Sequence, residues 1–183
     1  ASDIGDSNGT EAGVLGTTVI GNNTTNSIDF QGALYSFGTG TTNIEAKSGE
    51  TIDVTRNATT VEFKTAATSL SFDTAEIDLD NGSNLSIATA GGAISVVGIA
   101  GHSSETVVIN ANGGGTATET VTIGDIGDPT ADEILSVAIT GADGITLDGS
   151  NINTADTANP NISFTGAVDI KGSVTVSSDN ESN

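Results

Sequence analysis

The chain has 183 residues, of which 24 are Asp or Glu and four are Lys or Arg, and its formal net charge is −20. Proteins that bind nucleic acids or anionic membrane surfaces use clustered Lys and Arg, so this charge argues against both kinds of partner. The absence of Cys excludes disulfides, thiolate metal sites and cysteine nucleophiles. No run of about 18 apolar residues is present, and the sequence therefore predicts no membrane span.

The composition favours a thin aliphatic core. The chain is long enough for one domain with a real core, or for two small domains. Five Phe, one Tyr and no Trp leave few large side chains, so Ile, Val and Leu must supply most of the buried volume. The 24 Gly residues are typical of a chain with many tight turns.

Residues 1–25 form a low-complexity N-terminal extension, and we assign residues 26–183 to a single β-rich domain. The extension contains one apolar island, Val14-Leu15 with Val19-Ile20, which is too small to fold alone. We expect this island to contact an adjacent subunit. Position 1 is Ala rather than Met, which favours a processed chain and predicts a secreted or cell-surface protein.

Two short strands are expected around Ile28/Phe30 and Leu34/Phe37, and a regular repeat then follows over residues 43–96. Each repeat places an apolar, a polar and a second apolar residue before a polar connection, and the repeats start 7 to 9 residues apart. Alternation with a period of two predicts a strand with one buried face. The pairs are Ile44/Ala46, Ile52/Val54, Val61/Phe63, Leu70/Phe72, Ile77/Leu79, Leu85/Ile87 and Ile94/Val96. The intervening Glu45, Asp53, Glu62, Ser71, Asp78 and Ser86 should face solvent.

Similar pairs continue toward the C-terminus, first with longer and then with shorter connections. They are Val107/Ile109, Val121/Ile123, Val137/Ile139, Ile145/Leu147, Ile152/Thr154, Ile162/Phe164, Val168/Ile170 and Val174/Val176.

Two all-β architectures use many short strands. A β-solenoid (parallel β-helix-like) needs only two inward residues per strand, because each rung, meaning one full turn of the chain, stacks on the rung before it. A β-sandwich or jelly roll uses strands of about five or six residues with a thicker core, and it is the alternative. Two strands of the repeat span 15 to 18 residues, which is typical of a solenoid rung with two major strands. The scarcity of aromatic residues also favours the solenoid.

Three C-terminal phrases carry a resemblance to a known class of proteins: Gly-Ile-Thr-Leu-Asp-Gly (144–149), Asn-Ile-Ser-Phe-Thr-Gly (161–166) and Gly-Ser-Val-Thr-Val (172–176). Residues 140–179, and more loosely residues 43–97, resemble the strand repeats of filamentous-haemagglutinin-like exoproteins and autotransporter passengers. The resemblance implies a surface-exposed β-solenoid that acts as a stalk, adhesin or filament. It implies no catalytic residues.

One dense acidic cluster is the candidate metal site. Asp125, Asp128, Asp132 and Glu133 place four carboxylates within nine residues of a turn, and Ca²⁺ is bound by six to eight oxygen ligands that such loops supply. Asp78 lies in a second calcium-like stretch, but the spacing there favours an outward strand residue followed by a turn. His102, the only histidine, lies in an expected loop without a nucleophile motif.

Together these features predict an extracellular structural protein, a subunit or segment of a surface filament, stalk or adhesin. The expected partners are further copies of the chain and a host or neighbouring-cell surface. No catalysis and no required cofactor are expected, with calcium as the one candidate ligand. The alternative is a calcium- or carbohydrate-binding β-sandwich module of a secreted protein, although the 3% aromatic content provides few platforms for sugars.

Overall fold

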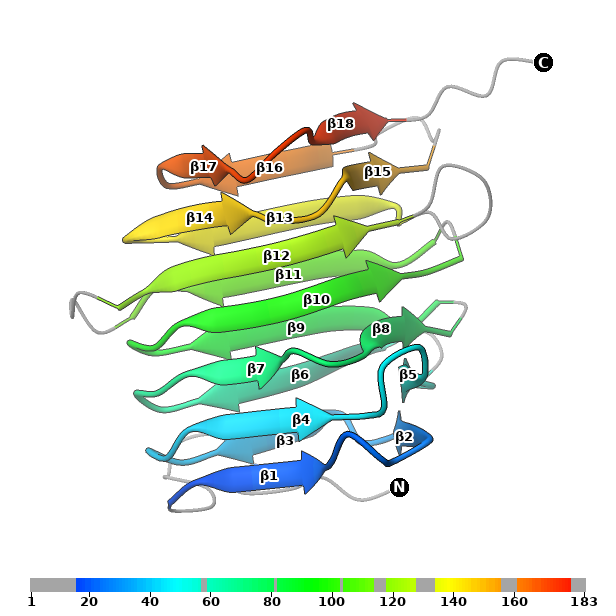
Figure 1. Ribbon diagram of the computed structural model, residues 1–183, viewed down its shortest axis with the longest axis vertical. Helices are drawn as coiled ribbons and strands as arrows, with labels where there is room; N and C mark the ends of the chain where they lie inside the picture. The colour runs from blue at the N-terminus through cyan, green and yellow to red at the C-terminus, as the bar shows by residue number, and fades with distance from the viewer. Residues whose placement is uncertain are drawn as a thin grey trace.

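The computed structural model describes residues 16–56, 59–80, 82–102, 104–113, 118–127, 134–155 and 161–178. Within these ranges the chain forms strands and no helix, and successive strands wind into a β-solenoid of about six rungs (Figure 1). All strand pairs are parallel. The predicted solenoid is therefore confirmed, and the sandwich alternative, which requires antiparallel neighbours, is wrong.

Each rung contributes to three faces. The first face contains β1 (Thr18–Gly21), β4 (Thr42–Glu45), β7 (Leu70–Phe72), β10 (Ile94–Ala100), β12 (Thr120–Ile126), β14 (Gly144–Leu147) and β17 (Val168–Ile170). The second face contains β2 (Ser27–Phe30), β5 (Thr51–Val54), β8 (Glu76–Leu79), the ends of β10 and β12, β15 (Asn151–Thr154) and β18 (Thr175–Ser178). The third face contains β3 (Leu34–Phe37), β6 (Thr60–Thr65), β9 (Asn84–Thr89), β11 (Thr106–Ala111), β13 (Ser136–Gly141) and β16 (Asn161–Thr165).

A rung is longer than the two-strand repeat suggested. Thr18 lies beside Thr42, and Thr42 lies beside Leu70, so successive rungs on the first face are 24 and 28 residues apart. The prediction of a two-strand rung of 15 to 18 residues is therefore wrong, because each rung passes through three faces. In two rungs a single long strand, β10 or β12, spans both the first and the second face. All three faces use the same phrase with two inward residues, and this phrase does not reveal how many strands complete one turn.

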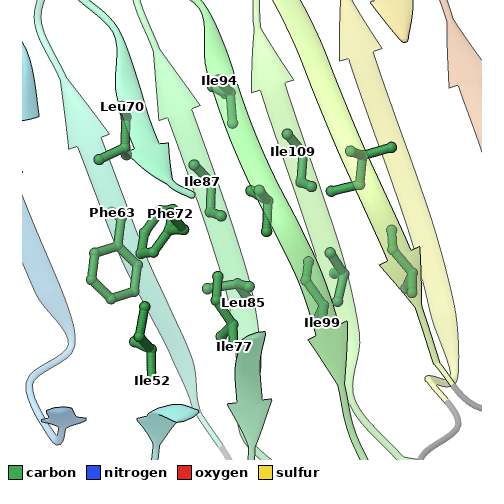
Figure 2. Close-up of a cluster of buried hydrophobic side chains, with 14 of the residues drawn as sticks. Ile52, Phe63, Leu70, Phe72, Ile77, Leu85, Ile87, Ile94, Ile99 and Ile109 are labelled. Atoms are coloured by element: carbon green, nitrogen blue, oxygen red, sulfur yellow. The ribbon is translucent and has the colours of Figure 1, made fainter. Parts of the chain in front are cut away.

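The inward positions predicted for residues 43–96 are confirmed. All fourteen apolar residues of the seven pairs are buried, with exposed fractions between 0% and 2%. Figure 2 shows part of this core, in which Phe63, Phe72 and Ile87 point into the interior between the faces. Ser71 was expected to face solvent but is buried, and its hydroxyl donates a hydrogen bond to the Asp73 carboxylate.

Aromatic rings gather near the N-terminal end of the solenoid. The ring centroid of Phe63 lies 4.9 Å from Phe30, 5.0 Å from Tyr35 and 5.4 Å from Phe72. These rings come from all three faces of the first three rungs, so four of the six aromatic side chains of the sequence fill one part of the core.

Only part of the apolar island of the N-terminal extension lies within the described residues. Val19 and Ile20 lie in β1, which pairs with β4 and so belongs to the first rung. Val14 and Leu15 lie outside the described residues. The contact of this island with an adjacent subunit stays a prediction.

Candidate assembly site at the ends of the solenoid

The interior of the solenoid is uncovered at its C-terminal end. Val168, Ile170 and Val176 have exposed fractions of 43%, 53% and 47%, although they occupy inward positions of β17 and β18. Their partners one rung earlier, Ile145, Leu147 and Ile152, are each at most 2% exposed. The difference arises because no later rung lies over β17 and β18 among the described residues.

The backbone of this end is also open. Among the strands that the structure describes, β16, β17 and β18 each have a strand neighbour on one side only. An edge strand of this kind presents free N–H and C=O groups, which can pair with another chain. The C-terminal end therefore combines an apolar interior with a template for strand addition.

The N-terminal end has matching features. In the described part of the chain, β1, β2 and β3 also have a strand neighbour on one side only. Ile20 on β1 and Ile28 on β2 are half-buried, whereas the residues that follow them in register, Ile44 and Ile52, are fully buried. The two ends lie at opposite extremes of the long axis (Figure 1).

Negative charge is distributed unevenly over the three faces. On the second face Asp53 lies between Asp29 and Asp78 in register, which places three carboxylates in one outward column. Asp78 is thus confirmed as an outward strand residue, followed by a turn at 80–83.

The third face is electrically neutral. Among the residues of its described strands, the only charged outward ones are Glu62 and Lys64, which form an ion pair of 3.8 Å. The outward residues of the next four strands are uncharged, and they are Asn84, Ser86, Ala88, Thr106, Val108, Asn110, Ser136, Ala138, Thr140, Asn161, Ser163 and Thr165. The net charge of −20 is therefore carried by the other two faces, the corners and the loops.

Only part of the predicted calcium site is described. Asp128, Asp132 and Glu133 lie outside the described residues. Asp125 lines a shallow groove of about 240 Å³ with Asp73 and Asp148. Its Oδ1 atom accepts hydrogen bonds from the backbone N–H groups of Ser150 and Asn151, at 2.5 and 2.8 Å. This carboxylate thus caps a turn of the next rung. The described ranges contain no group of three or more side chains suited to hold a metal. Calcium binding at the four residues stays a prediction.

A buried carboxylate that the sequence did not reveal lies beside His102. Glu105 is fully buried between β10 and β11. Its carboxylate accepts hydrogen bonds from the N–H groups of Gly82 (2.6 Å), His102 (2.6 Å) and Ser104 (3.0 Å), and from the Ser104 hydroxyl (2.7 Å). Burial alone would raise the pKa of Glu105, but these hydrogen bonds outweigh it and hold the pKa below its ordinary value of 4.5. His102 itself is exposed in the loop, as expected.

Comparison with known protein families, with curated proteins and with solved structures yields no match. Among the residues that the structure describes, none forms a helix with the length and apolar character needed to cross a membrane.

Proposed function

We propose that the chain is a secreted or cell-surface structural protein, without catalysis, whose solenoid associates end to end into a filament or stalk. The observation that carries this proposal is that the described strands leave the interior partly open at both ends. The inward positions of the middle rungs are buried, whereas Ile170, Val176, Ile20 and Ile28 occupy inward positions that remain partly open to solvent.

The chemistry of the ends favours association. Burying a half-exposed Val or Ile contributes about 1 kcal/mol, because full burial of such a side chain contributes about 1.5–3 kcal/mol. Strand pairing adds backbone hydrogen bonds, and a strand that runs in the same direction continues the parallel sheet. A rung of a second copy, added at either end, would bury the half-exposed apolar side chains and pair with the open strand edges at the same time.

The surface chemistry supports the extracellular part of the proposal. The net charge of −20 keeps the protein soluble, and the neutral third face offers a surface that does not repel a cell surface or a further copy. The C-terminal phrases that resemble exoprotein repeats lie in the last two rungs, on β14, β16 and the segment that enters β18. An adhesive role toward a host or neighbouring-cell surface is part of the same proposal.

The test is sedimentation velocity of three proteins over a range of concentrations: the unchanged chain, Ile170→Asp and Val108→Asp. Val108 is 44% exposed on the third face, so its substitution adds the same charge away from the ends. We expect the unchanged chain and Val108→Asp to form larger species as concentration rises, and Ile170→Asp to remain monomeric with a normal circular dichroism spectrum. An unchanged chain that stays monomeric at every concentration would contradict the proposal.

A further inference from the structure

We infer that the C-terminal end of one copy binds the N-terminal end of a second copy, head to tail, with β17 beside β1 and β18 beside β2 of the second copy. This inference rests on the proposed function and names the partner and the register of the same site. It identifies the occupant of the open end as another molecule of this chain.

The register follows from the columns of the solenoid. On the first face the inward position of Ile170 continues downward through Leu147, Ile123, Val96 and Phe72, and it reaches Ile20 on β1. On the second face the position of Val176 continues through Ile152, Ile126, Ile99, Ile77 and Ile52, and it reaches Ile28 on β2. Each column therefore begins and ends with a β-branched residue that is only partly covered. A second copy placed one strand spacing above the first continues both columns.

The outward residues of this contact avoid like charges. In the same register Asp169 faces Val19, and Ser177 faces Asp29. Asp169 is also paired with Lys171, whose Nζ atom lies 2.9 Å from its carboxylate. Like charges placed directly opposite each other destabilise a sheet, as in the column of three Asp residues within the body. Among the strands that the structure describes, the head-to-tail contact has no such pair, which matters in a chain of net charge −20.

The alternative contact between two C-terminal ends is electrostatically worse. A two-fold symmetric interface contains every contributing residue twice, so it brings two Asp169 carboxylates into one contact. It also places the edge strands antiparallel, whereas every pair within the chain is parallel. The head-to-tail contact uses different surfaces of the two copies and does not close, so it generates an open filament.

The contact is made by two of the three faces. The third face has six strands, and the paths of the first and second faces each have seven. When two copies stack, one strand position on the third face therefore stays empty above β16, beside the half-buried Ile162 and Phe164. The binding energy comes mainly from the first and second faces.

Disulfide trapping tests the register directly, because the chain has no Cys of its own. Adjacent parallel strands lie about 4.8 Å apart, within the Cα separation that a disulfide spans. We expect the double variant Val19→Cys/Asp169→Cys to form a ladder of covalent oligomers under oxidising conditions. A mixture of the two single variants should give one heterodimer, and the control pair Val108→Cys/Asp169→Cys should give no ladder. Asp29→Cys/Ser177→Cys provides a second register pair on the second face if the first variant folds poorly.

The outcomes separate the inference from the proposed function. Dimers of Asp169→Cys alone, without a ladder in either double variant, would show that the ends meet tail to tail, which overturns the inference but leaves end-to-end association in place. No covalent species in any variant, together with a monomeric unchanged chain, would overturn both.

Discussion

The backbone N–H of Gly82 donates a 2.6 Å hydrogen bond to Oε1 of Glu105, a carboxylate that lies fully buried one rung later in the chain. The same carboxylate accepts three further hydrogen bonds from the loop of His102 and Ser104. It therefore joins the turn before β9 to the loop before β11, where the third face of each rung begins. A charge in this position is tolerated because every donor around it points at the carboxylate.

The substitution Glu105→Gln should lower the free energy of unfolding by about 1–3 kcal/mol at neutral pH, because the amide places an N–H group against backbone donors. The pKa of Glu105 is lowered in the folded state, so its contribution to stability is complete above the ordinary value of 4.5 and is lost as the pH falls through the folded-state value. The difference between the two proteins should therefore shrink in acid. Urea unfolding from pH 3 to pH 7 measures it. Glu62→Gln, on the open third face, is the control, and a pH-independent difference would refute the account.

Because the C-terminal end of the solenoid is uncovered, the same Phe→Ala substitution should reduce the free energy of unfolding by different amounts at two positions of one inward column. Phe63 and Phe164 occupy the same inward column of the third face, but Phe63 is fully buried and Phe164 is only half-buried. Phe63→Ala should reduce the free energy of unfolding by about 3–5 kcal/mol, which is typical of a large core deletion. Phe164→Ala should cost clearly less in the monomer. Thermal melts at low protein concentration compare them, and equal costs would mean that the C-terminal end is covered.

The column of three Asp residues predicts a stabilising substitution. Asp53 lies between Asp29 and Asp78, so Asp53→Asn removes two like-charge neighbours and should raise the free energy of unfolding by about 0.2–1 kcal/mol. The gain should decrease as salt is added, since screening acts on exposed charges. Glu50→Gln removes one charge from the adjacent loop and leaves the column intact, so it should have a smaller effect. A loss of stability in Asp53→Asn would show that the 2.5 Å hydrogen bond from Thr51 to Asp53 is worth more than the repulsion.

Cations should stabilise the chain mainly by general screening, because the carboxylates are spread along its length. Thermal melts in sodium, magnesium and calcium chloride at matched ionic strength measure this effect. We expect magnesium and calcium to act alike. A large stabilisation by calcium alone, reversed by a chelator and absent in Asp128→Asn, would instead establish the predicted site at Asp125, Asp128, Asp132 and Glu133.

The inward side chains of the segment 43–96 could be predicted from the sequence, because any strand with one buried face alternates apolar and polar residues with a period of two. It also favoured a solenoid, since strands with two inward residues and few aromatics cannot fill a thick sandwich core. The number of strands per rung was not predictable. The pairs Ile44/Ala46, Ile52/Val54 and Val61/Phe63 look alike, although they lie on three different faces.

The candidate site was less predictable than the fold. Val168/Ile170 follows the same pattern as the buried pairs, and only the stacking order shows that it lies at an uncovered end. The burial of Glu105, next to the expected loop of His102, was not predictable because one of its donors, Gly82, lies 23 residues away in the chain. The neutrality of the third face was not predictable either, because it depends on which residues the strand register places on that face, and the net charge of the chain does not reveal this.

Electron microscopy of the unchanged chain at increasing concentration tests the central claim most directly. The account predicts unbranched particles with the width of one solenoid and lengths beyond that of a single chain. On the first and second faces the strand spacing of about 4.7–4.8 Å should continue from one copy to the next. Particles that keep the length of a single chain at every concentration, or that associate only side by side, would contradict it.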